Sequence, residues 1–374
     1  MEIQSLPFWM YIVGFLLLLG PLVVLHELGH YLVGRWFGVG ADAFSVGFGK
    51  EIAGYTDKRG TRWKLSALPF GGYVQFKGDM NPASMPDPDN PPPPDAFQTK
   101  PLWQKTLIVA AGPVANVLVA IAIFTGFFMA FGTPLPVDPS QENYIAAFAE
   151  ESAARDAGLE IGDRIVAIDG EEMVAFRELR QAVMLHPSRT FAVTVERDDQ
   201  RETIAVTSRP FEITDRFGNE SIIGRIGIET NLTETRFEPV GPFSAIGHAV
   251  DSTGNMFRII VLGIKQIFSG ERSVQELGGP ITIAKVSGER MSLGWLEFAN
   301  FAALISINLA FINLLPIPAL DGGHLAFYAV EAIRRKPASA RSQELAFRTG
   351  IALVLALMLF VTLLDIAKLP FWGS

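Results

Sequence analysis

The sequence of 374 residues contains no cysteine and only five histidines. Without cysteine, the chain can form neither disulfide bonds nor thiolate metal sites, so any metal ion must be held by histidine and carboxylate side chains. Charged residues are also scarce, at 19% of the chain, and the net charge is −8. Because no basic aromatic patch offsets this negative charge, we expect no nucleic-acid partner.

Hydrophobic residues, in contrast, make up 49% of the chain, and the mean hydropathy is +0.28. Crossing a bilayer takes about 20 apolar residues in a helix. Four stretches come close to this length, at residues 8–30, 106–131, 297–315 and 349–367. The first has no basic residue before it and no small-residue cleavage site after it, which indicates a retained helix rather than a signal peptide. The sequence therefore predicts an α-helical multi-pass membrane protein with about four transmembrane helices.

The orientation of these helices follows from lysine and arginine, which concentrate in cytoplasmic loops. The loop at residues 35–105 carries nine of them, and the short loop at 332–348 carries five. Both loops are therefore expected in the cytoplasm. This arrangement places both termini and the long insert at 133–295 outside the cytoplasm.

Several segments outside the spans have recognisable patterns. Residues 44–76 contain short β-prone runs separated by glycine and by a turn-like stretch, which predicts β-hairpins on the cytoplasmic side. Residues 81–95 are rich in proline and acidic residues, which predicts a disordered linker. The apolar stretch at 256–268 is too short to span and contains two basic residues, so an amphipathic helix on the membrane surface is expected.

Residues 140–230 alternate strand-like and helical runs, which predicts a compact α+β module with its own core. Four regions are thus expected along the chain. Residues 1–132 hold the first two transmembrane helices and the hairpin loop, and residues 133–235 form the inserted α+β domain. Residues 236–295 form the membrane-surface segment, and residues 296–374 hold the last two transmembrane helices.

The cytoplasmic end of the first span carries the motif HELGH, from His26 to His30. Residues four apart share one face of a helix, so the two imidazoles can converge on one ion, with Glu27 beside them. Two histidines and one carboxylate suit a catalytic zinc site with an open position for water. Glu27 can then act as general base and pass the proton to a leaving amine. The motif therefore predicts zinc-dependent peptide hydrolysis.

The third zinc ligand must come from another segment. Asp321, in the stretch NLLPIPALDGGH directly after the third span, is at the same side of the membrane as His30. His324 is the alternative ligand, although it can also serve as a cap or an outer partner. We favour Asp321, because two histidines and one carboxylate are a common catalytic zinc set.

Taken together, the segments HELGH, GFGK, PFGGYVQF, AAGPVANVLVAI and NLLPIPALDGGH resemble the site-2 protease family of intramembrane zinc metalloproteases. The resemblance covers nearly the whole chain and is strongest to the bacterial branch that regulates sigma-E. It implies a zinc enzyme that cleaves transmembrane segments, with His26, His30 and Asp321 as zinc ligands and Glu27 as the catalytic residue. It also implies that Asn313 holds substrate.

The segment AGLEIGDRIVAIDG, at residues 157–170, resembles part of a PDZ domain. Enterobacterial relatives carry two such domains in tandem, whereas the insert here has room for one. A PDZ domain usually captures a peptide or a chain end beside a strand edge, so such a ligand is a candidate for this domain.

Cleaving a membrane helix requires that the substrate be unwound and held extended, because its carbonyls are already bonded. A strand edge at residues 62–74 can add the substrate as an extra strand, with Gly71 and Gly72 allowing close approach. A plain structural hairpin explains the same residues equally well. Asn116, in the small-residue stretch AGPVAN, either braces the active-site helices or serves only in their packing.

The expected function is intramembrane proteolysis of single-span membrane proteins in the bacterial inner membrane. An anti-sigma factor already shortened by another protease is one candidate substrate. Two alternatives remain at this point. A zinc transporter would place histidine and aspartate in spans but would not need Glu27, and a non-catalytic PDZ scaffold would not need His26.

Overall fold

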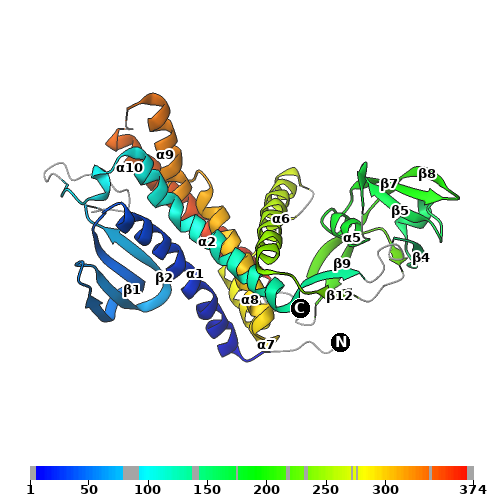
Figure 1. Ribbon diagram of the computed structural model, residues 1–374, viewed down its shortest axis with the longest axis horizontal. Helices are drawn as coiled ribbons and strands as arrows, with labels where there is room; N and C mark the ends of the chain where they lie inside the picture. Colours follow the sequence, from blue (N-terminus) through cyan, green and yellow to red (C-terminus); the bar gives the residue numbers. More distant parts are fainter. Residues whose placement is uncertain are drawn as a thin grey trace. The chain divides into compact units, whose positions relative to one another are not determined.

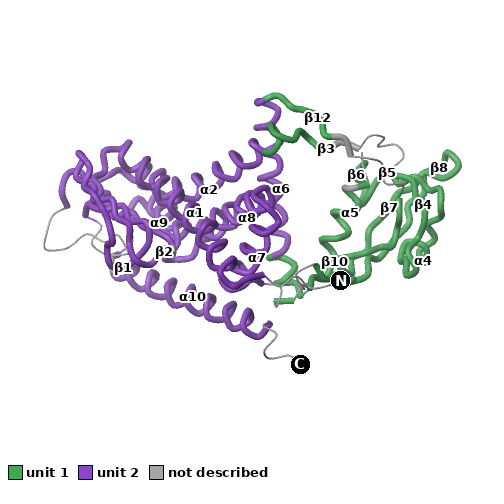
Figure 2. Tube along the Cα trace, turned by 90° about the horizontal axis from the view of Figure 1, so that it is seen from below, with its two compact units in different colours: residues 1–5, 127–241, 264–276 green, residues 6–126, 242–263, 277–374 purple. Residues whose placement is uncertain are grey.

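The computed structural model describes residues 6–78, 92–136, 143–173, 176–215, 220–230, 235–270, 273–274, 277–336 and 339–368. Most of the linker predicted at 81–95 lies outside these ranges. The chain forms two compact units, which Figure 2 shows in different colours. Unit 1 comprises residues 1–5, 127–241 and 264–276, and unit 2 comprises residues 6–126, 242–263 and 277–374. One unit boundary falls inside helix α2 (Leu102–Phe131) and another inside helix α6 (Pro242–Ser269).

Four helices in the described part of the chain are long and apolar enough to cross a membrane (Figure 1). They are α1 (Phe8–Trp36), α2 (Leu102–Phe131), α8 (Trp295–Leu314) and most of α10 (Ala340–Ala367). At about 1.5 Å per residue, even the shortest of them matches a hydrocarbon core about 30 Å thick. This agrees with the four predicted spans and with a multi-pass membrane protein.

Small residues let the helices of unit 2 approach closely. A Cβ atom added to Gly29 of α1 would collide with the backbone oxygen of Ala111 in α2. On α8, Ser306 donates a hydrogen bond of 2.8 Å to the backbone oxygen of Asn116 in α2, and both residues are fully buried. Helix α2 is therefore held against both α1 and α8 in the half of the unit where the histidines lie.

Unit 2 contains further helices besides these. Helix α7 (Pro280–Ser292) packs against α1 at Gly14 and Gly288, where a Cβ atom on either residue would touch the opposite backbone. The carboxylate of Asp365 on α10 accepts hydrogen bonds from the backbone of Gly279 and Thr282 at the start of α7. The stretch predicted at 256–268 lies within the longer helix α6 (Pro242–Ser269).

The hairpin predicted at 44–76 is present as β1 (Ala41–Thr56) and β2 (Arg62–Phe76). Both strands change register along their length, and Val46 of β1 is paired with Leu65 and also with Gly72. The first half of β1 therefore lies between the two halves of β2. In this register residues 72–76 have one strand neighbour, so they form an edge of the sheet.

An apolar cluster fastens the hairpin to the end of α1 that carries the histidines. Tyr31 of α1 is in edge-to-face contact with Phe44 of β1 at 5.7 Å between ring centroids. Phe76 of β2 is stacked with Phe97 at 5.9 Å, and all four side chains are buried. Phe97 begins the short 3-10 helix η1 (Phe97–Thr99) before α2. The hairpin is thus a packed part of unit 2.

Unit 1 contains a four-stranded antiparallel sheet with the order β6-β5-β7-β8. These strands are β5 (Arg164–Ile168), β6 (Glu171–Glu172), β7 (Thr190–Arg197) and β8 (Gln200–Thr207). Alternating apolar residues of β7 point inward, and Phe191, Val193 and Val195 are fully buried. They pack with helices α4 (Ala153–Asp156) and α5 (Phe176–Met184) into one core.

Three two-stranded sheets complete unit 1 in the described residues. They pair β3 (Thr133–Pro136) with β12 (Thr235–Glu238), β4 (Ile145–Phe148) with β11 (Ile228–Thr230), and β9 (Arg209–Thr214) with β10 (Glu220–Arg225). The unit is therefore α+β in composition.

Candidate metal centre

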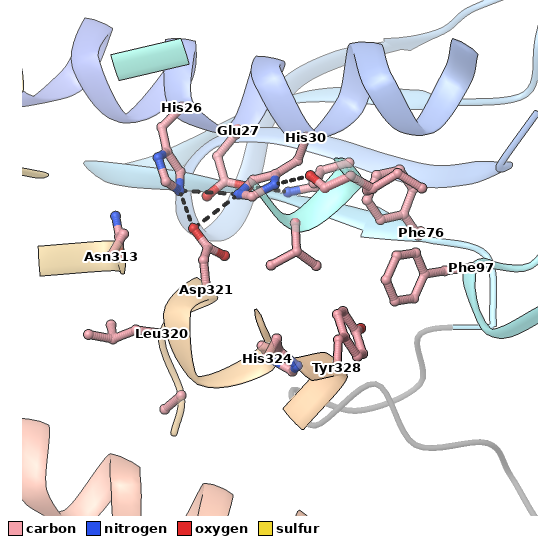
Figure 3. A pocket seen from close by; sticks show the side chains of 14 residues that line it. His26, Glu27, His30, Phe76, Phe97, Asn313, Leu320, Asp321, His324 and Tyr328 are labelled. Atoms are coloured by element: carbon pink, nitrogen blue, oxygen red, sulfur yellow. Dashed lines mark hydrogen bonds and ion pairs between the residues drawn. The ribbon is translucent and has the colours of Figure 1, made fainter. Parts of the chain in front are cut away.

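His26 and His30 lie on α1, four residues apart, and therefore on one face of the helix. Their relative exposure is 8% and 9%, and their Nε2 atoms are 3.2 Å apart (Figure 3). Pairs of buried imidazoles are unusual in an apolar helix, where unpartnered polar groups are costly. The spacing of HELGH thus produces the convergence that the sequence predicts.

Asp321 joins the two histidines from a distant segment as the first residue of α9 (Asp321–Arg334). The loop before it is tight, because Cβ atoms on Gly322 and Gly323 would collide with backbone oxygens of that loop. Ala319 adopts a positive φ of 85°, an uncommon conformation for a residue with a side chain. This loop geometry places Asp321 Oδ2 at 3.2 Å from His26 Nε2 and 3.5 Å from His30 Nε2.

The three side chains fit a metal ion. One potential ligand atom from each lies within 4.8 Å of the others. Although Asp321 Oδ2 is close to both imidazoles, it is buried and has no hydrogen-bond partner. A buried oxygen without a hydrogen-bond donor lowers the stability of the folded protein unless another group interacts with it. A bound cation would provide that interaction. Two imidazoles and one carboxylate form the donor set of many catalytic zinc sites.

The outer nitrogen of each imidazole has a partner on α2. His30 Nδ1 lies 2.8 Å from the backbone oxygen of Ile108, and His26 Nδ1 lies 3.3 Å from Nδ2 of Asn116. Metal-binding histidines almost always have such a second hydrogen bond, which fixes the ring and its tautomer. The inner nitrogens are thereby left facing Asp321.

Glu27 lies between the histidines in sequence and points into the same cavity (Figure 3). Its Oε2 accepts a hydrogen bond of 3.0 Å from the backbone N–H of Val74 in β2. The edge of the hairpin sheet thus orients the glutamate. Glu27 is not part of the group of three potential ligands, so its carboxylate stays available for proton transfer.

The cavity around these residues has a volume of about 300 Å³. Its polar part is built from α1, α8 and α9, and its apolar part from β2, η1, α2 and α9. The lining side chains are His26, Glu27, His30, Val74, Phe76, Phe97, Ile108, Val109, Asn313, Ala319, Leu320, Asp321, His324 and Tyr328. A site with polar groups at one end and apolar walls at the other suits a peptide with apolar side chains.

The alternative ligand, His324, also lines the cavity but lies outside the group of three. It follows Asp321 by one turn of α9, and its ring is next to Tyr328 at 6.5 Å between centroids. Burial lowers the pKa of His324, which favours a neutral imidazole. Asp321 is therefore the residue that the fold brings to His26 and His30.

The three residues predicted to bind substrate fall in two places. Asn313, near the end of α8, lines the cavity next to Asp321 (Figure 3). Gly71 and Gly72, on β2, are not among the lining residues. A Cβ atom on Gly72 would collide with the backbone oxygen of Ser45, and one on Gly71 would press on the ring of Phe48. The close approach that these glycines allow is therefore to β1 of the same sheet.

Sequence reasoning missed the contacts of Val74 and Ile108, because both act through backbone groups. No side-chain pattern marks such groups. Asn116, in the small-residue stretch AGPVAN, was already a candidate brace of the active-site helices, but its contact with His26 was not predicted.

Comparison with known proteins places these features in a family. Residues 14–357 match the family described as "Peptidase family M50". A protein of Agrobacterium fabrum named "Putative zinc metalloprotease Atu1380" is 43% identical over 96% of each chain. A protein of the same description from Rhizobium meliloti is 42% identical over 94% of this chain and 95% of its own. "Metalloprotease MmpA" of Caulobacter vibrioides is 32% identical over 96% of each chain.

Among solved structures, the PDZ domain of an SdrC-like protein from Listeria monocytogenes is 21% identical to part of this chain. The match covers 24% of this chain and 87% of that domain, with a TM-score of 0.20. At this score the likeness establishes no shared fold.

Proposed function

This chain belongs to peptidase family M50 and is a zinc metalloprotease, and on that premise we propose that it cleaves single-span membrane proteins within their transmembrane segments. One observation carries the proposal. The two histidines and the glutamate lie on α1, a helix long and apolar enough to cross a membrane, so the reacting groups belong to the membrane region of the enzyme. A soluble substrate would not need a site built on such a helix.

In this proposal His26, His30 and Asp321 hold the zinc ion. A zinc ion held there would polarise the peptide carbonyl and acidify water for the attack. The buried oxygen of Asp321 that lacks a hydrogen-bond partner supports this assignment.

Glu27 has the role of general base. Its carboxylate lines the same cavity as the three ligands and is held at 3.0 Å by the N–H of Val74. A carboxylate in this position takes a proton from the attacking water and returns it to the leaving amine, so that the peptide bond is replaced by a free acid and a free amine. Before substrate binds, the hydrogen bond from β2 keeps the carboxylate aimed into the cavity.

Substrate would bind in an extended conformation along residues 72–76 of β2. These residues have one strand neighbour in the described register, and Val74 and Phe76 line the cavity. A peptide added as a further strand would gain the backbone hydrogen bonds that it loses on unwinding. Asn313 faces the cavity next to Asp321 and can hold a backbone amide of the substrate. Gly71 and Gly72 support this edge by letting β2 lie close to β1.

The α+β region of unit 1 would act as a PDZ-like domain, outside the cytoplasm, that binds a peptide or a chain end. Its motif at residues 157–170 supports this role. The enzyme would then act in the bacterial inner membrane on substrates already cut once, for example an anti-sigma factor.

The direct test is Glu27→Gln. Glutamine has nearly the same size and keeps an acceptor for Val74, but it cannot take the proton from water. We expect the rate of cleavage of a single-span test substrate in detergent to fall by about 10²–10⁴-fold. Zinc measured on the same sample should remain at one ion per chain, because Glu27 is not a proposed ligand. Glu297→Gln, the same change at an exposed residue of α8, is the matched control and should cleave normally.

Cleavage by Glu27→Gln within a few-fold of wild type, at full zinc content, would contradict the role of Glu27. Placing the same cleavage sequence in a soluble peptide tests the substrate class. If the soluble peptide is cut as fast as the membrane-spanning one, the proposal of transmembrane substrates is wrong.

A further inference from the structure

We propose that Asn116 is a positioning residue: its side-chain oxygen accepts a hydrogen bond from Nδ1–H of His26, and this leaves Nε2 of His26 as the nitrogen that binds the metal. The inference rests on the zinc centre proposed above and adds a fourth side chain to its support. Asn116 belongs to α2 and would act on a bound metal ion only through His26.

The position of Asn116 allows this contact. The residue is fully buried, and its amide lies 3.3 Å from Nδ1 of His26. In the present amide orientation Nδ2 is the atom next to the imidazole, and Oδ1 is buried without a hydrogen-bond partner. A rotation of the amide by 180° exchanges oxygen and nitrogen with almost no change in shape. The rotation gives the partnerless oxygen a donor on His26.

The chemistry of the imidazole requires an acceptor at this place. A neutral imidazole carries one proton, on either Nδ1 or Nε2. The Nε2 atom of His26 faces Asp321 Oδ2 and His30 Nε2, each at 3.2 Å, so this is the nitrogen directed at the metal site. It can bind a cation only when the proton is on Nδ1. That proton is then buried, and its hydrogen-bond partner in the structure is the Asn116 amide.

His30 shows the same arrangement with a backbone acceptor. Its Nδ1 lies 2.8 Å from the carbonyl oxygen of Ile108, which can only accept. In a neutral His30 the proton is therefore on Nδ1, and Nε2 carries no proton. Ile108 and Asn116 are eight residues apart, with Gly112 halfway between them, so all three lie along one face of α2. The two imidazoles thus take their two acceptors from a single helix face.

Gly112 makes this face close enough to serve both rings. A Cβ atom there would collide with Nε2 of His30 and lie 2.7 Å from Cε1 of His26. The helix is also held by α8, because Ser306 donates a hydrogen bond to the backbone oxygen of Asn116. The fold therefore fixes the distance between the amide and His26, and the amide rotation alone decides which atom meets the imidazole.

Three variants of the full-length protein in detergent test the proposal through zinc affinity rather than cleavage. Asn116→Leu has a similar volume and suits an apolar helix, but it removes the acceptor. We expect it to weaken zinc binding by about 10–100-fold. Asn116→Asp offers only acceptors to Nδ1 and should bind zinc at least as tightly as wild type. Asn300→Leu makes the same substitution at an exposed residue of α8, and its zinc affinity should stay within twofold of wild type.

Two outcomes of the affinity measurement overturn the role of Asn116. One is Asn116→Leu with wild-type affinity, and the other is Asn116→Asp with a loss as large as that of Asn116→Leu. A wild-type protein that binds no zinc would instead overturn the metal centre itself, so the two failures can be told apart.

A second measurement does not depend on the stability of Asn116→Leu. The chain has only five histidines, so ¹⁵N-histidine labelling gives few nitrogen signals to assign. In the zinc-loaded wild type, we expect the His26 proton on Nδ1, and a shift of this proton signal in Asn116→Asp as its hydrogen bond strengthens. A His26 proton on Nε2, or a signal unchanged in Asn116→Asp, would refute the contact.

Discussion

At the scale of single residues, the choice between Asp321 and His324 decides the chemistry of the centre. The two residues are on the same helix and line the same cavity. Only Asp321 is close to both imidazoles, at 3.2 and 3.5 Å, whereas the His324 ring lies beside Tyr328. A third imidazole would make a site without a carboxylate, so the identity of this ligand sets the charge around the metal ion.

Asp321→Ala is expected to lose most of its zinc, because one of three protein ligands disappears. His324→Ala should keep one zinc ion per chain, since it removes a neighbouring imidazole that is not a ligand. Metal analysis of the two purified proteins, after the same dialysis, gives the comparison. Full zinc content in Asp321→Ala together with zinc loss in His324→Ala would show that the third ligand is the histidine.

At the scale of elements, an ion pair connects two strands of the sheet in unit 1. In unit 1 the carboxylate of Asp163, just before β5, is fully buried and accepts two hydrogen bonds from Arg197 at the end of β7, at 2.6 and 2.7 Å. Burial alone raises the pKa of Asp163, but Arg197 and the backbone N–H of Glu160 outweigh it, and the pKa is below its ordinary value. The folded state therefore favours the ionised carboxylate.

This pair predicts a pH dependence of the stability of unit 1. A carboxyl group whose pKa is lower in the folded state stabilises that state above its unfolded pKa of about 4. The contribution disappears as the pH falls through the folded-state pKa. Asp163→Asn should therefore lower the free energy of unfolding by about 1.5–3 kcal/mol at pH 7. The difference from wild type should shrink below pH 4.

Hydrogen exchange of the β5 and β7 amides, measured in wild type and variant at each pH, reports this difference. Glu202→Gln is the control, because Glu202 is exposed and its carboxylate is 3.9 Å from Arg197. Its exchange should match wild type. Equal protection in Asp163→Asn and wild type at pH 7 would show that the pair does not stabilise the sheet.

At the scale of the whole molecule, the distribution of basic residues predicts how the chain crosses the membrane. Fourteen lysines and arginines lie in the two loops at 35–105 and 332–348. This asymmetry predicts that the β1–β2 hairpin is in the cytoplasm and that the α+β region of unit 1 is outside it. In this predicted orientation the catalytic motif is at the cytoplasmic end of α1.

The absence of cysteine makes this topology simple to measure. Lys58→Cys places one thiol in the β1–β2 turn, and Asp199→Cys places one in the β7–β8 turn, both at exposed positions. In spheroplasts, a maleimide that cannot cross membranes should label Asp199→Cys alone. Lysed membranes should show both labelled, as a control for reactivity. Equal labelling of the two variants in intact spheroplasts would contradict the predicted orientation.

Local patterns in the sequence were enough to predict the four long apolar helices, the hairpin and half of the centre. The lengths of the apolar runs predicted the four spanning helices, because the bilayer thickness sets the number of residues required. The i, i+4 spacing of HELGH put both imidazoles on one face of α1, because the helical repeat dictates it. Glycines and a turn marked the hairpin at 44–76. Each of these conclusions depends on neighbours within a few residues.

Only the tertiary structure decided which distant groups complete the centre. Asp321 and His324 are one helical turn apart, and the tight loop before α9, with its glycines and the positive φ of Ala319, determines which of them meets α1. The Val74 N–H reaches Glu27 because the two halves of β2 pair with opposite sides of the first half of β1. No local pattern in the sequence encodes this register. Ile108 and Asn116 reach the imidazoles because Gly29 and Gly112 let α1 and α2 come into contact. These partners are 47 to 295 positions apart in the chain, and their meeting depends on packing between elements rather than on the preference of any one segment.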